Sequence, residues 1–359
     1  WIETMPCNFN LRDLAVKVKE GVRAAGGTPM EFNTVSISDG YSMASEGMKA
    51  SLVSRLVIAD SIELMSRGYH FDGVIALSGC DKTIPGTVMA LARLDRPSLM
   101  LYGGSIQPGK HAGQDITIQD VFEAVGGYAK GDVTLEDLRD LERRACPGEG
   151  SCAGLFTANT MSTAIEALGM SLPGDASIPA ADPRRVDHAR RAGQTLLRLL
   201  EEDLRPRDIL TKDAFENAIT VAVSMGGSTN MVLHLIAIAK EAGVSLNMGD
   251  FDRISNNTPY IADMKPSGRY VMADLDRYGG VSLVMKRLLG AGLLHGDAMT
   301  VTGKTLRENV ESMETVEDQP VIYQIDAPRS PTGGLAIVHG NLAPEGSVIK
   351  VAGHQQKVF

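Results

Sequence analysis

The sequence predicts an α/β protein in which a doubly wound parallel sheet with extra helices is followed by the start of a second, all-β (barrel-like) domain. Three features lead to this prediction. Short apolar strands alternate with amphipathic helices over roughly the first hundred residues, a helix-rich section follows, and strand-like segments between Pro/Gly turns begin near residue 318. We therefore expect an α/β domain over residues 1–318 and the first strands of an incomplete C-terminal β domain over residues 319–359.

The N-terminal part of the chain carries the alternation on which the predicted sheet depends. Apolar residues at helical spacing indicate helices, and short runs rich in Val and Ile indicate buried strands. The expected elements are a helix over Leu11–Ala25, a strand over Phe32–Ser38, a helix over Ser51–Ser66, a strand over Gly73–Leu77, a helix after Pro85 and a strand over Ser98–Tyr102. Because strands and helices alternate, the sheet should be parallel.

The rest of the chain supplies the extra helices and the C-terminal strands. The expected helices cover Ile118–Gly126, Leu135–Ala145, Gly154–Met170, Pro183–Glu202, Asp213–Val223 and Thr229–Ala242. The expected strands cover Val321–Ile325, Leu335–Val338 and Ser347–Val351. Because no helix separates these last strands, they indicate the opening of a separate β domain.

The composition argues against several classes of protein. Of the 359 residues, 43% are hydrophobic and 22% are charged, and no apolar run is long enough to cross a membrane. A net charge of −9 without a basic stripe argues against a nucleic-acid surface. Four cysteines without a CxxC pair disfavour a disulfide framework and a structural zinc site. The chain begins at Trp1 and ends at Phe359 after strand-like sequence, so we expect that the protein extends beyond both ends.

Reactive side chains follow two of the predicted strands. Asp39 follows the first strand, and Cys80, Asp81 and Lys82 follow the second. Because ligands of open α/β sheets bind beyond the carboxyl ends of the strands, these groups should face one crevice. Each has an ordinary alternative, in which Asp39 closes a turn, Asp81 caps a helix and Lys82 is solvated. Their coincidence at neighbouring strand ends favours a site.

The other cysteines divide into two kinds. Cys152 lies in a glycine-rich turn that leads into a helix, where exposed amides and the helix dipole would favour its thiolate. Cys7 follows Pro6 in another predicted turn, whereas Cys146 lies at the end of an amphipathic helix. A lone cysteine is most often a buried, small apolar residue, and we assign that ordinary role to Cys146. The turns around Cys7, Cys80 and Cys152 make that role less expected for them.

A further candidate is the segment Gly226–Asn230, which precedes an apolar helix. Amides at the start of that helix could hold a carboxylate or phosphate of a ligand, which makes Ser228 and Thr229 candidate substrate-binding residues. The alternative is plain N-capping of the helix by Ser228 or Thr229, and the sequence favours this alternative.

Thiolates and carboxylates select different metals. Thiolates bind soft iron–sulfur centres, while a pair of carboxylates binds a hard ion such as Mg²⁺. A site that holds both would be bimetallic in character. Three protein thiolates would leave one iron of a cluster short of a protein ligand, and such an open iron is a Lewis acid.

Several uncommon motifs occur in one order along the chain. They are Pro6-Cys7-Asn8, Ser38-Asp39-Gly40, Ser78-Gly79-Cys80-Asp81-Lys82, Cys146-Pro147-Gly148-Glu149-Gly150-Ser151-Cys152, Thr157-Ala158-Asn159-Thr160-Met161 and Gly226-Gly227-Ser228-Thr229-Asn230. With these motifs in this order, the chain resembles the dihydroxy-acid/phosphogluconate dehydratase family from about Trp1 to Phe359.

The resemblance implies an activity and two sets of ligands. The activity is the dehydration of a 2,3-dihydroxy carboxylate of the dihydroxy-isovalerate type to a 2-keto acid, in branched-chain amino-acid biosynthesis. The implied ligands are Cys7, Cys80 and Cys152 for an iron–sulfur cluster, 2Fe–2S rather than 4Fe–4S, and Asp39, Asp81 and a carbamylated Lys82 for Mg²⁺. A carbamate requires a neutral amine, which burial of Lys82 would promote. Cys146 matches a cysteine that is not a ligand, and the family implies a homodimer that acts on a small dihydroxy acid.

The resemblance also indicates what lies outside the chain. The family carries a further Mg²⁺-binding glutamate and a serine thought to be the base in its C-terminal β domain, and neither motif occurs before Phe359. We therefore expect no catalytic base within these residues. The run Ala153–Met161 reads AGLFTANTM where the family has GGMYTANTM, a difference that could reshape the wall of the pocket.

Two other functions compete with this interpretation. A sister dehydratase could act on sugar acids or phosphogluconate with the same ligands. A non-catalytic iron–sulfur redox sensor is the alternative from another class, although paired carboxylates argue against it because electron transfer needs no hard-metal site. The protein is expected to be soluble and intracellular. A eukaryotic source, which the sequence of Lys265–Met272 favours, would place it in the mitochondrial matrix or another organelle, and a bacterial source would place it in the cytoplasm.

Overall fold

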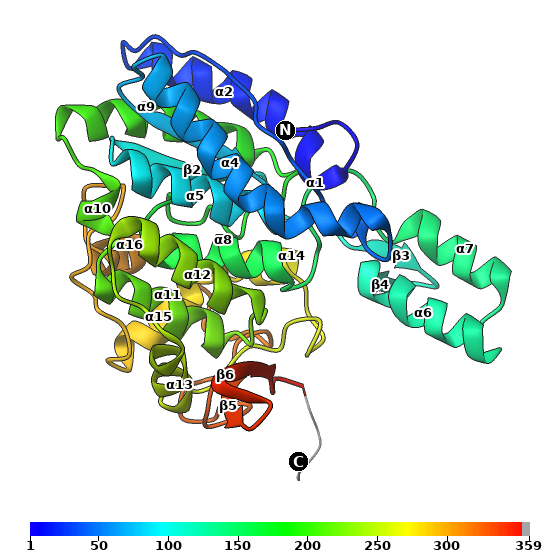
Figure 1. Ribbon diagram of the computed structural model, residues 1–359. Coiled ribbons are helices and arrows are strands. Elements are labelled where there is room, and N and C mark those ends of the chain that lie inside the picture. Colours follow the sequence, from blue (N-terminus) through cyan, green and yellow to red (C-terminus); the bar gives the residue numbers. More distant parts are fainter. Residues whose placement is uncertain (354–359) are drawn as a thin grey trace.

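A two-stranded parallel sheet lies at the centre of the N-terminal part of the protein. In the computed structural model, which describes residues 1–353, β1 (Val74–Ser78) pairs with β2 (Ser98–Tyr102). Helices cover both of its faces (Figure 1), which confirms the mixed α/β class. They are α5 (Thr83–Leu94), backed by α4 (Lys49–Gly68), on one face, and α2 (Leu11–Ala24) with α9 (Arg184–Glu201) on the other.

The prediction of a strand over Phe32–Ser38 is wrong. This segment belongs to no strand, and a cavity of about 860 Å³ lies between it and the free edge of β1. Phe32 and Thr34 line the cavity from one side, and Ile75 and Leu77 line it from the other. Because the two backbones do not meet, they cannot form a ladder of hydrogen bonds. Within residues 1–353 the parallel sheet therefore has two strands instead of the larger, doubly wound sheet expected.

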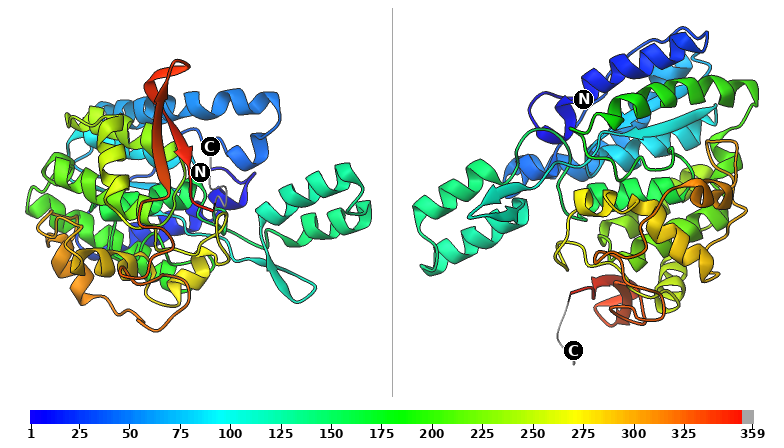
Figure 2. Two further views of the ribbon diagram at one scale, coloured as in Figure 1. Left: turned by 90° about the horizontal axis from the view of Figure 1, so that it is seen from below. Right: turned by 180° about the vertical axis from the view of Figure 1, so that it is seen from behind.

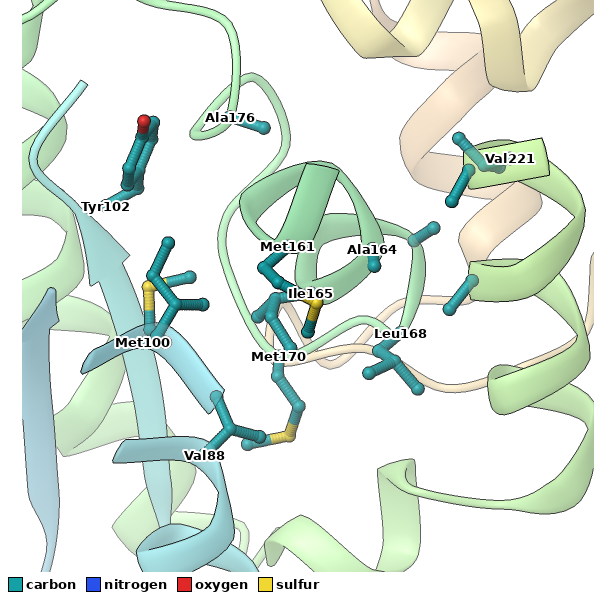
Figure 3. Packing of buried hydrophobic residues seen from close by; sticks show 14 of the residues in the cluster. Val88, Met100, Tyr102, Met161, Ala164, Ile165, Leu168, Met170, Ala176 and Val221 are labelled. Atoms are coloured by element: carbon teal, nitrogen blue, oxygen red, sulfur yellow. The ribbon is translucent and has the colours of Figure 1, made fainter. Parts of the chain in front are cut away.

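A buried helix, α8 (Thr157–Ala167), connects the sheet layer to a second group of helices. Every residue of α8 is buried, so the helix packs on all of its sides. Figure 3 shows Met161 on the side of β2 and Met100, and Ala164 on the side of α11 (Lys212–Ser224) and Val221. The interior is therefore continuous from the sheet, through α8, to the C-terminal helices.

Most of the expected helices are confirmed to within a few residues of their ends. Besides those already given, they are α6 (Ile118–Lys130), α7 (Leu135–Arg144) and α12 (Asn230–Ala242). The helices that the sequence analysis did not predict are α1 (Pro6–Phe9), α3 (Asp39–Ser42), η1 (Glu46–Met48), α10 (Pro206–Ile209), α13 (Met248–Asn256), α14 (Met272–Asp276), α15 (Gly280–Gly290) and α16 (Leu306–Ser312). None of the helices in residues 1–353 combines the length and the apolar character needed to cross a membrane.

Residues 109–144 form an arm that projects from the body of the protein (Figure 2). A hairpin of β3 (Gly109–His111) and β4 (Gln114–Ile116) is followed by α6 and α7. The arm has a small core of Ile116, Val121, Ala124 and Leu138, which Ala145 completes just beyond the end of the arm. Gly109 lies so close to Arg144 that a Cβ at Gly109 would collide with the Arg144 carbonyl oxygen. The arm therefore leaves and rejoins the body at adjacent points.

The C-terminal residues form a hairpin rather than a barrel. The antiparallel strands β5 (Leu335–Gly340) and β6 (Ala343–Lys350) confirm the last two segments that were expected as strands, except that β6 ends one residue before Val351. The strand expected over Val321–Ile325 is reduced to a single bridge between Ile322 and Ala262, because these residues pair with an irregular segment of the helical body. Residues 1–353 contain no closed barrel.

Phe215 of α11 tests the packing of this interior. Its side chain is 0% exposed, so Phe215→Ala should leave a cavity and lower the free energy of unfolding by about 3–5 kcal/mol. Phe122 of α6 is 47% exposed and is the matched control. Phe122→Ala should change the free energy of unfolding by no more than about 0.5 kcal/mol. Urea denaturation followed by circular dichroism measures both changes, and equal losses would contradict the packing described here.

Candidate functional site

The residues expected to carry chemistry lie beyond the carboxyl end of β1. Cys80, Asp81 and Lys82 form the turn between β1 and α5, Asp39 begins α3, and Cys7 lies in α1. Two groups of contacting side chains result. They are called here the thiol cluster (Cys7, Cys80 and Ser38) and the carboxylate cluster (Asp39, Asp81, Lys82 and Ser51).

Gly79 allows three distant segments to meet at this turn. A Cβ at Gly79 would collide with the backbone carbonyl oxygen of Cys7, so a residue with a side chain would push α1 away. Ser151 reaches the same turn from another direction, because its hydroxyl donates a hydrogen bond to the Gly79 carbonyl. Cys7, Cys80 and the segment that carries Cys152 are thereby held around one point.

The thiol cluster holds Cys7 and Cys80 around the hydroxyl of Ser38. The Ser38 Oγ lies 3.4 Å from the Cys7 Sγ and 3.6 Å from the Cys80 Sγ. The interaction with Cys80 lowers the pKa of Cys7, whereas the interaction with Cys7, together with burial, raises the pKa of Cys80 well above its ordinary value. Asn8 Nδ2 donates a hydrogen bond of 3.0 Å to the Cys7 sulfur, which also lowers the pKa of Cys7.

Cys152 does not have the reactive thiolate expected from its sequence context. Burial raises its pKa to about 12, and the nearby charge of Cys80 acts in the same direction. The helix that follows, α8, begins only at Thr157, so its dipole is too distant to offset the burial. The expectation that a helix N-terminus favours the Cys152 thiolate is therefore wrong for the protein alone. A bound metal would have to displace the proton.

The carboxylate cluster is an enclosed group of charges. Lys82 Nζ donates hydrogen bonds to Asp39 Oδ2 at 2.6 Å and to Asp81 Oδ2 at 3.2 Å. Ser51 of α4 donates from its hydroxyl to Asp39 Oδ1 at 2.5 Å. Lys82 is 5% exposed and Asp39 is 7% exposed, so water contributes little to balancing their charges. The three charged residues therefore depend on one another.

The pKa values in this cluster shift in different directions. Burial raises the pKa of Asp81 to about 7, and the hydrogen bond with Asp39 acts in the same direction. Burial acts on Asp39 too, but hydrogen bonds with Asp81, Lys82 and Ser51 outweigh it and lower the pKa of Asp39. For Lys82, burial favours a lower pKa, but the two carboxylates prevail and raise it. Burial therefore favours the neutral Lys82 amine, as expected, but the two carboxylates outweigh that effect in this arrangement.

The remaining candidates lie apart from these clusters. Cys146 is exposed beyond the end of α7, so the role of a buried, small apolar residue that was expected for it is wrong. Thr229 is the N-cap residue of α12 but makes no side-chain capping bond, whereas the Ser228 hydroxyl accepts a hydrogen bond from the Asn230 amide at 3.2 Å and contacts Thr157 Oγ1 at 2.8 Å, which ties the start of α12 to α8. Among the described residues 1–353, no hydrogen bond joins Ser228 or Thr229 to either cluster. The capping alternative thus has direct geometric support at Ser228.

Three polar residues of the site are not among the candidates expected from the sequence. Ser38 contacts both thiols, Ser51 binds Asp39, and Asn8 binds Cys7. Ser38 and Asn8 stand beside the named candidates within their motifs, so adjacency was an available signal. No signal in the sequence pointed to Ser51, because the contact between Ser51 and Asp39 depends on how α4 packs.

The donor atoms of the two clusters suit different metals. Within residues 1–353, no three His, Cys, Asp or Glu side chains are close enough to form a ready-made metal site. The donors come instead as a thiol pair, with Cys152 within electrostatic reach, and as a carboxylate pair with Lys82 between its members. The buried carboxylate of Asp39 and the largely shielded carboxylate of Asp81 favour a cation between them, a position that the Lys82 ammonium takes and that a divalent ion could take. The sets therefore fit a soft centre on the thiols and a hard cation on the carboxylates.

Comparison with known proteins identifies two matching family profiles. The profile described as "Dihydroxy-acid/6-phosphogluconate dehydratase N-terminal" matches residues 1–309. The profile described as "Dihydroxy-acid/6-phosphogluconate dehydratase C-terminal" matches residues 320–359. The first match includes every residue of the thiol and carboxylate clusters.

Curated relatives agree with these profiles. A protein named dihydroxy-acid dehydratase from Roseiflexus castenholzii is 58% identical over 356 residues, which are 99% of this chain and 64% of the relative. Proteins of the same name from Koribacter versatilis and Sulfurisphaera tokodaii are 58% and 56% identical over 100% and 98% of this chain, and 63% of each relative is covered. The chain thus spans less than two thirds of the length of these relatives. On the evidence of both profiles and these identities, the chain belongs to the dihydroxy-acid/6-phosphogluconate dehydratase family.

Proposed function

We propose that the full-length protein is a hydro-lyase, a dihydroxy-acid dehydratase of branched-chain amino-acid biosynthesis. It would convert a 2,3-dihydroxy carboxylate of the 2,3-dihydroxy-isovalerate type to a 2-keto acid. The observation that carries this proposal is the buried meeting of the thiol and carboxylate clusters beyond β1, in a chain whose relatives bear this name. Soft and hard donors side by side suit a substrate that presents a carboxylate and must lose a hydroxyl group.

The residues proposed to hold the cofactors are those of the two clusters together with Cys152. Cys7, Cys80 and Cys152 would hold an iron–sulfur cluster of the 2Fe–2S type, and Asp39, Asp81 and a carbamylated Lys82 would hold Mg²⁺. When bound, these groups supply a Lewis acid for the departing C3 hydroxyl and a cation for the substrate carboxylate and C2 hydroxyl. The chain itself keeps the thiol and carboxylate clusters adjacent, since Ser38 precedes Asp39 and Cys80 precedes Asp81.

Lys82 must change its partners before it can become a carbamate. A protonated amine has no lone pair with which to attack CO₂, and the carboxylates keep Lys82 protonated. A divalent cation bound by Asp39 and Asp81 would repel the ammonium and lower the pKa of Lys82. Binding of the cation and carbamylation would therefore favour each other.

The proton at C2 is removed by a group that we place outside these residues. Dehydration removes that proton and the C3 hydroxide and leaves an enol, which tautomerises to the 2-keto acid. Resemblance to the family places the base and a further Mg²⁺ ligand in the C-terminal β domain. We propose that residues 1–318 form the cluster- and metal-binding domain and that residues 319–359 open this second domain, a division that the two profile matches support.

The assembly and the location are proposed from the family as well. The resemblance supports a homodimer that acts on a small dihydroxy acid. The relatives named above are from bacteria and an archaeon, and for such a source we propose the cytoplasm. Ser228, beside its capping role, and Thr229 are retained as substrate-binding candidates.

The cysteine assignments can be tested by metal analysis of the anaerobically purified full-length protein. Cys80→Ser should lose most of the iron and the visible absorption, because serine oxygen is a poor ligand for a soft centre. Cys146→Ser is the matched control and should keep both, since Cys146 is exposed and apart from the thiol cluster. Equal iron content in the two variants would contradict the assignment. If Cys80→Ser altered the redox response of the protein but left the rate of dehydration at its wild-type value, the redox sensor would be favoured.

The substrate class can be tested by assaying the full-length enzyme with three kinds of substrate. We expect the 2-keto acid to form from 2,3-dihydroxy-isovalerate. Sugar acids and 6-phosphogluconate should turn over far more slowly. Turnover of only the sugar acids or of phosphogluconate would establish the sister activity instead. Keto-acid release, followed by coupled reduction, measures all three rates.

Lys82→Arg separates the charge of Lys82 from its proposed carbamate. Arginine keeps a positive charge beside Asp39 and Asp81, so the fold and the iron content should remain. It cannot be carbamylated, and the misplaced cation should lower kcat by about 100-fold or more. Steady-state kinetics with a parallel iron assay measure both effects. Wild-type kcat in Lys82→Arg would rule out a required carbamate.

A further inference from the structure

The segment that carries Cys152 has no regular secondary structure of its own. It runs from Ser151, which forms an isolated bridge with Ser105, to Thr157 at the start of α8. The amide of Ser151 donates to the Gly104 carbonyl at 2.9 Å, which fixes the backbone before the cysteine. The direction of the thiol therefore also depends on what fixes the backbone after it.

Asn159 of α8 fixes the backbone that follows the cysteine. Its side-chain amide donates one hydrogen bond to the Cys152 carbonyl oxygen and another, of 2.7 Å, to the Gly154 carbonyl oxygen. Both hydrogens of Nδ2 are thus used within the segment Cys152–Gly154. Asn159 is 0% exposed, so water cannot readily replace its amide as a donor to these carbonyls.

Tyr102 fixes Asn159 in turn. The Tyr102 hydroxyl donates to Asn159 Oδ1 at 2.7 Å, which leaves Nδ2 to face the two carbonyls. Tyr102 is fully buried at the end of β2, beside α8 (Figure 3). Its own amide donates to Asp175 Oδ2 at 2.9 Å, and Arg185 donates to its carbonyl at 3.1 Å and to Asp175 Oδ1 at 2.8 Å. A buried ion pair thereby anchors the whole chain of contacts to the sheet.

We propose that Asn159, oriented by Tyr102, is a positioning residue for Cys152. By fixing the two carbonyls that follow the thiol, the pair holds Cys152 toward Cys7 and Cys80 and so governs how firmly an iron–sulfur cluster is retained. The inference rests on the proposed function, in which Cys152 is a ligand of that cluster. Hydrogen-bonded groups behind a metal ligand commonly set its orientation, and their loss weakens metal binding by about 10–100-fold.

A matched control separates positioning of the ligand from support of the fold. Asn217 of α11 is also 0% exposed and also binds the backbone with both ends of its amide, through the carbonyl of His295 at 3.0 Å and the amide of His295 at 2.7 Å. Asn159→Ala and Asn217→Ala remove the same side chain from equally buried sites. Only Asn159 contacts the segment that carries Cys152.

The test uses anaerobically purified full-length enzyme loaded with iron and sulfide. Iron release to a chelator should be about tenfold faster or more in Asn159→Ala than in the wild type, and the visible circular dichroism of the cluster should change. Tyr102→Phe keeps the ring and removes only the hydroxyl, so it should show the same changes to a smaller degree. Asn217→Ala should lower the denaturation midpoint while its spectrum and iron release match the wild type.

Wild-type spectra and iron release in both Asn159→Ala and Tyr102→Phe would overturn the inference. If Asn159→Ala does not fold, Tyr102→Phe decides the question alone. Equal acceleration of iron release in Asn159→Ala and Asn217→Ala would also overturn it, because general destabilisation would then account for the effect. Cys152→Ser distinguishes the two levels of the argument: if it releases iron like the wild type, Cys152 is not a ligand, and the ligand set of the proposed function fails together with this inference.

Discussion

The site depends on one constraint: two carboxylates lie close together beyond β1, where burial and their proximity disfavour two negative charges and raise the pKa of Asp81 to about 7, so a cation between them favours the ionised pair. Lys82 provides this cation, at 2.6 Å from Asp39 and 3.2 Å from Asp81. Removing one member of a buried ion pair typically costs about 3–5 kcal/mol, because the other charge is left unbalanced. The contact also fixes the path of the chain. The segment before Asp39 forms no strand, yet its end is held at the sheet by this charge and by Ser38.

Two pairs of consecutive residues, Ser38–Asp39 and Cys80–Asp81, place the thiol cluster and the carboxylate cluster next to each other without mixing their donors. Ser38 faces the thiols while Asp39 binds Lys82, and Cys80 faces Cys7 while Asp81 binds Lys82. Each pair therefore contributes one member to each cluster. Since neighbouring side chains diverge from the backbone, two short turns suffice to build two chemically distinct sites.

Much of this site could be predicted from the sequence, because strand ends are where open sheets bind ligands. Cys80, Asp81 and Lys82 follow β1 as expected, and Asp39 meets them although the strand expected before it is absent. The run Phe32–Ser38 has the composition of a strand, but composition does not say whether a neighbouring edge is within reach. The expected thiolate of Cys152 and the expected effect of burial on the Lys82 amine each rest on a single local effect. In the folded protein, burial outweighs any effect of the helix dipole and raises the pKa of Cys152. For Lys82, the two carboxylates outweigh burial and raise the pKa of the amine. Such balances depend on contacts between distant segments.

The arm formed by residues 109–144 has a consequence for how this protein can vary. Because its two ends lie side by side at Gly109 and Arg144, and because it has its own small core, it behaves as an insertion into the α/β body. The main chain on either side would need little adjustment if the arm were shortened, lengthened or replaced. A change in the length or surface of the arm would therefore leave the ligands beyond β1 in place.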